Sequence, residues 1–166
     1  MLENVIRSQY HATLSMMQQA VEKYPPALWN RSEDKNRTWQ VAYHALFYVH
    51  LYLQPTADDF VFWSGHVADA ENMDPELPAR EAETKAPYTQ EDMLDYIAFC
   101  RGQVDDIVPL LDLNGESGFH WLPMSKTELQ FYSIRHLQTH TGELAERLWT
   151  AAGIEIDWVG MGDGKK

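Results

Sequence analysis

The chain has 166 residues, of which 45% are hydrophobic and 12% aromatic, enough apolar material for one folded domain over residues 1–166. This composition argues against intrinsic disorder. The 13 Lys and Arg against 25 Asp and Glu leave a formal charge of −12, which opposes approach to a phosphate backbone and excludes general nucleic-acid binding.

The cysteine count and the hydropathy pattern indicate a protein that stays in the cytoplasm. Cys100 is the only cysteine, so no intramolecular disulfide can form and a reducing compartment fits best. Residues 1–7 lack the basic and then apolar pattern of a signal peptide. The most apolar segment, residues 45–53, is far shorter than the roughly 20 residues that cross a bilayer, so we expect no membrane span.

Two helices are predicted in the first third of the chain. Apolar residues recur at intervals of three and four through residues 3–23, and Pro25 and Pro26 end that helix. Thr38 is expected to cap a second helix that ends at Pro55. Because the second helix is apolar on nearly all sides, we expect it to contact several neighbours.

A long connection and a third helix follow. Residues 55–87 contain four prolines and many acidic residues, a pattern typical of a long crossover with room for one short helix. Thr89 and Asp92 form a capping pattern at the start of a third helix. Its apolar stripe continues to Leu111, and Pro109 is expected to kink or end it.

The last long helix is predicted between Ser125 and Gly153. Ser125 and Glu128 form a capping box, and Gly153 suits the left-handed residue after a helix end. Residues 154–159 alternate like a short strand or an extended segment. Four helices with one long connection between the second and third predict an all-α four-helix bundle. The sequence contains no glycine-rich dinucleotide motif, phosphate loop or serine-hydrolase elbow.

His136 and His140 are the first candidates for chemistry. They stand four residues apart on the last helix, so both imidazoles point to one side and could share a metal ion, although this spacing also occurs by chance. Glu143 continues the same stripe and could reach the site directly or through water. It also precedes Arg147 by four residues, and the spacing favours a surface ion pair between them over a catalytic role.

His44 lies on the apolar second helix, between Val41 and Tyr48, where an unpaired imidazole would carry a desolvation cost. A neutral imidazole is a good ligand for zinc, nickel or iron, and bundles build metal sites from inward side chains on facing helices. A core histidine bonded to a carbonyl or a tyrosine explains the same position equally well.

The remaining histidines and the cysteine are weaker candidates. His50 lies about 120° around the helix from His44 and cannot point to the same place. Cys100 falls on the apolar stripe of its helix and is expected to be a small buried hydrophobe. Surface or packing roles are expected for His11, His66 and His120.

His44 together with residues 135–144, RHLQTHTGEL, resembles the DinB/YfiT-like superfamily of metal-dependent enzymes. The resemblance covers nearly the whole chain by helix order, and residues 117–122 resemble one branch of the family. It implies a four-helix bundle with a long crossover between the second and third helices. It also implies that His44, His136 and His140 bind a divalent metal ion, with zinc or nickel expected.

The resemblance also implies a reaction class. Characterised members include thiol S-transferases that use bacillithiol or mycothiol and a mycothiol-dependent isomerase, in which the metal activates a thiol. We therefore expect a thiol S-transferase with a small-molecule substrate. A metal-dependent hydrolase, or a non-catalytic bundle that acts in protein association, is the alternative, and no catalytic residue is assigned.

Homodimerisation is a further expectation. It rests on six Trp, eight Tyr and six Phe and on the frequent pairing of bundles in the family. The alternative is that the aromatic residues fill the core of a monomer.

Overall fold

The structure is a computed structural model that describes residues 1–31, 33–73 and 88–162. Within these residues the chain is all-helical, with five α-helices, short 3-10 turns and no β-strand, only an isolated bridge between Glu116 and Ser125. The elements in chain order are α1 (Leu2–Lys23), α2 (Pro26–Trp29), α3 (Thr38–Leu53), η1 (Ala57–Asp59), α4 (Gln90–Ile107), η3 (Val108–Leu110) and α5 (Lys126–Ala152).

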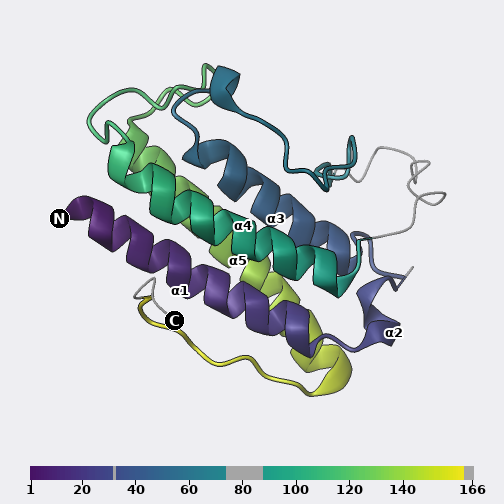
Figure 1. The fold of residues 1–166 in the computed structure, drawn as a ribbon. Coiled ribbons are helices and arrows are strands. Elements are labelled where there is room, and N and C mark those ends of the chain that lie inside the picture. Colours follow the sequence, from purple (N-terminus) through teal and green to yellow (C-terminus); the bar gives the residue numbers. More distant parts are fainter. Residues whose placement is uncertain (32, 74–87, 163–166) are drawn as a thin grey trace.

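The four long helices, α1, α3, α4 and α5, run side by side (Figure 1). α3 packs against α4 and α5, and α1 packs against the same two helices. Each long helix contributes fully buried apolar side chains to one core, and the largest of these include Tyr10, Leu14, Tyr43, Leu46, Met93, Ile97 and Leu137. Burial of this area is the main term that stabilises the arrangement. The predicted all-α class is confirmed.

The first two predicted helices are confirmed, with one error at a helix start. α1 ends at Lys23, and Pro26 opens the one-turn helix α2, which the sequence pattern did not predict. Arg37, not Thr38, is the cap residue of α3. Thr38 is the first helical residue, and its hydroxyl donates to the carbonyl of Leu28 at 3.1 Å. That bond ties α2 to α3, so the hydroxyl is used for tertiary contact instead of capping.

The predicted ends of α4 and α5 agree with the structure. Thr89 and Asp92 form a reciprocal capping box, and α4 ends at Ile107, where Pro109 belongs to the 3-10 turn that follows. At the start of α5, the Ser125 hydroxyl accepts from the amide of Glu128 at 3.2 Å, which is one half of the predicted capping box; among the described residues the return bond from the Glu128 side chain is not formed. Gly153 ends α5 with a φ of 68°, the left-handed conformation that glycine adopts without steric cost.

The crossover between α3 and α4 is partly described. Residues 74–87 lie outside the described residues, and the part before them contains η1, the short helix for which the sequence left room. Tyr88 holds this part in place: its hydroxyl donates to the carbonyl of Gly65 at 3.0 Å and accepts from the amide of Val67 at 2.8 Å. Gln40 on α3 also donates to the carbonyl of Asn72 at 3.0 Å, so the described part of the crossover lies against α3.

The C-terminal tail is extended, as one of the two sequence alternatives predicted, and no strand forms among its described residues. It runs back along α1 (Figure 1). The amide of Asp157 donates to the side chain of Gln19 at 2.7 Å, and the amide of Gly162 donates to the carbonyl of Ser8 at 3.1 Å. Among the helices of the described residues, none combines the length and apolar character needed to cross a membrane.

Candidate metal centre

Three histidines from two packed helices meet at one point. His44 Nε2 on α3 lies 3.2 Å from His136 Nε2 on α5, across 92 residues of sequence. His140 Nε2, one turn further along α5, lies 3.2 Å from the same nitrogen. One potential ligand atom from each residue falls within a 4.8 Å cluster. The structure therefore brings together the three residues that the resemblance implied.

The packing of α5 against α3 explains why these side chains face each other. Leu137 and Leu144 are fully buried, and they fix the rotation of α5 so that the stripe carrying His136 and His140 faces α3. All three histidines are half-buried, so they lie at the edge of the core and not at its centre.

Two of the three imidazoles have their far nitrogen fixed by an acceptor. His44 Nδ1 donates to the backbone carbonyl of Glu71 at 2.6 Å. His140 Nδ1 donates to the carboxylate of Glu143 at 3.1 Å. The hydrogen bond from His140 contributes most to lowering the pKa of Glu143, and the charge of Arg147 lowers it further. This carboxylate is therefore ionised and can only accept hydrogen bonds. With a proton at Nδ1, each neutral ring presents a bare lone pair at Nε2.

The electrostatics favour neutral imidazoles at His136 and His44. Burial, together with the neighbouring His140 and His44, lowers the pKa of His136 to about 4. Burial also lowers the pKa of His44, although its bond to the Glu71 carbonyl opposes that shift. A neutral imidazole is the form that binds a metal, because an imidazolium has no free lone pair at nitrogen.

The arrangement fits a divalent cation. His136 Nε2 stands 3.2 Å from two nitrogens whose lone pairs both face it, and its own Nδ1 is buried without a partner within the described residues. A cation placed among the three nitrogens would satisfy all three lone pairs. Three imidazoles with a further open position are a common donor set of catalytic zinc, and imidazole also suits nickel, copper and iron.

Glu143 has two partners. Its carboxylate contacts His140 and also receives the guanidinium of Arg147, so the predicted ion pair is present and the same side chain reaches the histidine cluster. Arg147 additionally donates to the backbone carbonyl of Asn36 at 2.7 Å. The sequence reasoning treated the ion pair and a role at the site as competing interpretations, whereas one carboxylate, with two oxygens, makes both contacts.

Tyrosines form the next layer on one side of the cluster. The ring of Tyr48 lies edge-on to His44, with centroids 4.8 Å apart, and edge-on to His136 at 5.4 Å. Tyr52 lies behind Tyr48 at 5.5 Å and beside Tyr132 at 5.9 Å. Burial raises the pKa of the Tyr48 hydroxyl, and the charge of Glu71 adds to that shift. Tyr48 is therefore an uncharged phenol beside the histidines.

The sequence left open that His44 is bonded to a carbonyl or a tyrosine, and the structure shows a bond to a carbonyl; the pattern did not single out Glu71 or Tyr48 as the neighbours. Tyr48 follows His44 by one helical turn, a spacing that was available as a signal. Glu71 contacts His44 through its backbone carbonyl, which every residue type possesses, so no side-chain pattern could have marked it. One carboxylate oxygen of Glu71 is also buried, with no hydrogen-bond partner in the part of the chain that the structure describes.

The other histidines lie apart from this cluster, as expected. His50 is buried, its Nδ1 lies 3.2 Å from the hydroxyl of Tyr96 on α4, and burial lowers its pKa to about 4. His66 pairs with the hydroxyl of Tyr43 at 2.6 Å. His120 is exposed beside Trp121.

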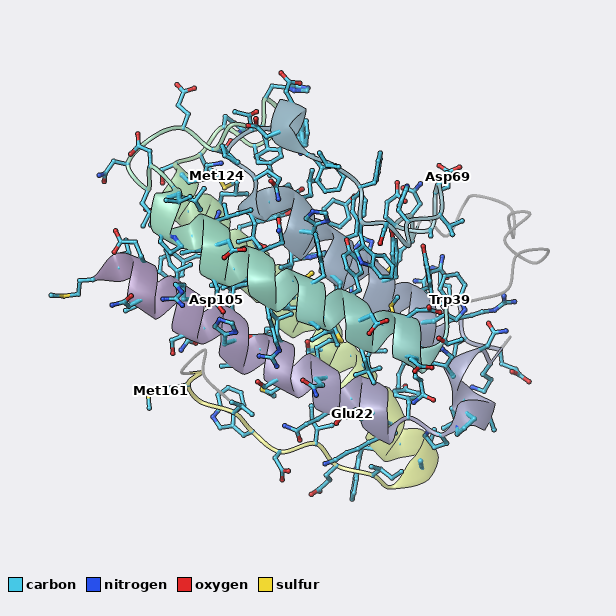
Figure 2. All side chains as sticks on the ribbon, in the orientation of Figure 1. Glu22, Trp39, Asp69, Asp105, Met124 and Met161 are labelled. Carbon is cyan, nitrogen blue, oxygen red and sulfur yellow. The ribbon has the colours of Figure 1, made fainter. Side chains whose placement is uncertain are left out.

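His11 has a packing role between α1 and α4. Its ring is buried, and its Nε2 lies 3.0 Å from the carboxylate of Asp105, which also pairs with Arg7. Figure 2 shows Asp105 on α4, at the side where α4 runs alongside α1. Cys100 is fully buried, and burial raises the pKa of its thiol, so it behaves as the small hydrophobe that the sequence predicted.

Comparisons with family models, with curated proteins and with solved structures returned no significant match.

Proposed function

We propose that the protein is a metal-dependent enzyme of the DinB type, in which His44, His136 and His140 hold one divalent cation, zinc or nickel. The observation that carries this proposal is the convergence of three Nε2 atoms, two of them backed by acceptors at Nδ1. In the same proposal, α1, α3, α4 and α5 form a four-helix bundle whose long crossover joins its second and third members.

The reaction that we propose is transfer of a low-molecular-weight thiol to an electrophilic small molecule. A cation held by three neutral ligands keeps its full positive charge and an open position, and it would supply the Lewis acidity that lowers the pKa of a thiol. The histidines bind the cation, and Tyr48 offers an uncharged hydroxyl beside them. Hydrolysis of an ester or amide is the alternative reaction at the same centre.

The metal is tested first. Purified protein is expected to contain about one divalent ion per chain by elemental analysis, and the triple variant His44→Ala, His136→Ala, His140→Ala is expected to contain none while keeping its helical circular dichroism. Equal metal content in both proteins would refute the proposed centre.

The reaction is tested next with the metal-loaded protein. A low-molecular-weight thiol with an electrophile is compared with ester and amide substrates, and the triple variant serves as the background. Thiol-dependent loss of the electrophile supports the transferase, and metal-dependent hydrolysis without thiol turnover supports the hydrolase. Loss of folding on chelation, with no turnover of either kind, would favour a structural metal in a protein that acts by association.

We also propose that the protein is cytoplasmic and forms a homodimer. The single buried thiol suits a reducing compartment. Large apolar side chains that a partner copy could cover include Trp121, Phe131 and Trp149, each about half exposed. Sedimentation at micromolar concentration tests the dimer, and a species of 19.2 kDa would contradict it.

A further inference from the structure

We infer that Glu143 and Arg147 form a positioning pair that determines which nitrogen of His140 is free to bind a metal. The inference rests on the proposed function for the role of the metal. The choice of tautomer at His140 depends only on contacts among residues of this chain and not on a bound metal.

The contacts at His140 define what Glu143 does. The carboxylate oxygen Oε2 lies 3.1 Å from His140 Nδ1, and a carboxylate accepts but cannot donate. The proton of the neutral ring is therefore held at Nδ1. Without such an acceptor, a neutral histidine side chain carries its proton mainly at Nε2, the nitrogen that here faces His136. Glu143 thus selects the tautomer whose lone pair points into the cluster.

Arg147 holds the Glu143 carboxylate in the position where it accepts from His140 Nδ1. One guanidinium nitrogen binds the second carboxylate oxygen of Glu143, and another donates to the carbonyl of Asn36 at 2.7 Å. Asn36 lies in the loop that leads into α3, so the guanidinium is anchored at both ends. The side chains are only 24% exposed for Arg147, 32% for Glu143 and 13% for His140, so solvent screens these contacts less than it screens a surface pair.

The three histidines differ in the partners of their Nδ1 atoms. Among the described residues, His44 donates to a neutral carbonyl, His136 has no partner at Nδ1, and His140 alone meets a charged group. A hydrogen bond to a charged acceptor is roughly twice as strong as a neutral one. The orientation of His140 therefore depends on the side chain of another residue, Glu143, and substitution of Glu143 can perturb it.

The tautomer is measured in the metal-free protein by nitrogen-15 NMR of labelled histidine. In wild type we expect the His140 proton at Nδ1, and in Glu143→Ala we expect it to move mainly to Nε2. Glu143→Gln keeps the size of the side chain but has only one acceptor oxygen. Because Arg147 can only donate, that oxygen is expected to face Arg147 and the amide NH2 to face His140 Nδ1, so this variant should also carry the proton mainly at Nε2. Glu146→Ala is the matched control, because Glu146 is exposed on the same helix and its carboxylate accepts from Thr150. An Nδ1 tautomer that persists in folded Glu143→Ala would overturn the inference.

Metal affinity then tests whether Arg147 acts through Glu143. We expect the Kd for zinc to rise about tenfold in Glu143→Ala, the lower end of the loss seen when such partners are removed. Arg147→Met should weaken binding less, and the double variant should bind no more weakly than Glu143→Ala alone. Additive losses would overturn the role of Arg147. If Glu143→Ala does not fold, Glu143→Gln and Arg147→Met carry the same comparison.

The two measurements separate this inference from the proposed function. The tautomer is read without metal, so an expected tautomer shift in a protein that binds no zinc would refute the metal centre and leave the positioning intact. Zinc binding by wild type, together with an unshifted His140 tautomer in Glu143→Ala, would refute the positioning role and leave the metal centre intact.

Discussion

The buried imidazole of His50 makes a pH-dependent contribution to stability that can be isolated by substitution. Its ring lies among Phe60 and Phe99, each with its centroid 4.8 Å away, and burial lowers its pKa to about 4. In the unfolded chain the pKa returns to about 6.5. Below pH 6.5 the unfolded state therefore binds a proton that the folded state does not, and stability falls as the pH falls from about 6.5 towards 4.

The magnitude follows from the difference in pKa. About 2.5 pKa units at roughly 1.4 kcal/mol each give about 3 kcal/mol between neutral pH and pH 4, of which about 2 kcal/mol is lost by pH 5. His50→Phe removes this loss and leaves the hydroxyl of Tyr96 without its partner at 3.2 Å, which costs about 1 kcal/mol at every pH. The variant should therefore be less stable than wild type at pH 7.5 and more stable at pH 5.

Urea unfolding of both proteins at four pH values from 7.5 to 5, with a chelator present, measures this crossover. The metal-site histidines are common to both proteins, so their titration cancels in the difference. A difference in unfolding free energy that stays constant across this range would refute the reasoning.

Three further predictions concern other positions. Lys126 is buried with its ammonium donating to the carbonyls of Gln54, Pro55 and Ser117, so Lys126→Met should lower the unfolding free energy by about 2–4 kcal/mol, measured by urea unfolding. Gly118 has a φ of +82°, and an added Cβ would lie 2.1 Å from the Pro55 carbonyl oxygen, so Gly118→Ala should lower the Tm. Gly142→Ala is the control and should not lower it, because the space around its Cβ is open. Cys100 should react with a thiol reagent only at the rate of unfolding, and fast modification of the native protein would contradict its burial.

The helices were predictable because their signals are local. The spacing of apolar residues, the box at Thr89 and Asp92, and the glycine at position 153 each act within one or two turns. Thr38 was assigned wrongly because its hydroxyl serves a contact with Leu28, ten residues away, and propensity carries no information on such a contact. α2 was missed because a single turn, which begins at the second of the two prolines, is too short to show periodicity.

The site was predictable only in part. The spacing of His136 and His140 placed both on one face, because helical geometry fixes it. The sequence alone could not place His44 beside these two residues, because that depends on how α3 packs against α5. Its position on an apolar helix was equally compatible with a histidine in the core that binds no metal. The carbonyl of Glu71 and the double engagement of Glu143 depend on tertiary placement of a backbone atom and of a second carboxylate oxygen, so the sequence pattern could not reveal them.

The central claim is tested most directly by calorimetric titration of zinc into metal-free wild type, His44→Ala, His136→Ala, His140→Ala and His50→Ala at two pH values. Wild type and His50→Ala should each bind about one equivalent, and each of the other three should bind at least tenfold more weakly, because each has lost one of the three converging nitrogens. Binding should weaken as the pH approaches 4, because the lowered pKa of His136, about 4, is where protons begin to compete with the metal for that ring. Equal zinc binding by all five proteins would contradict the account.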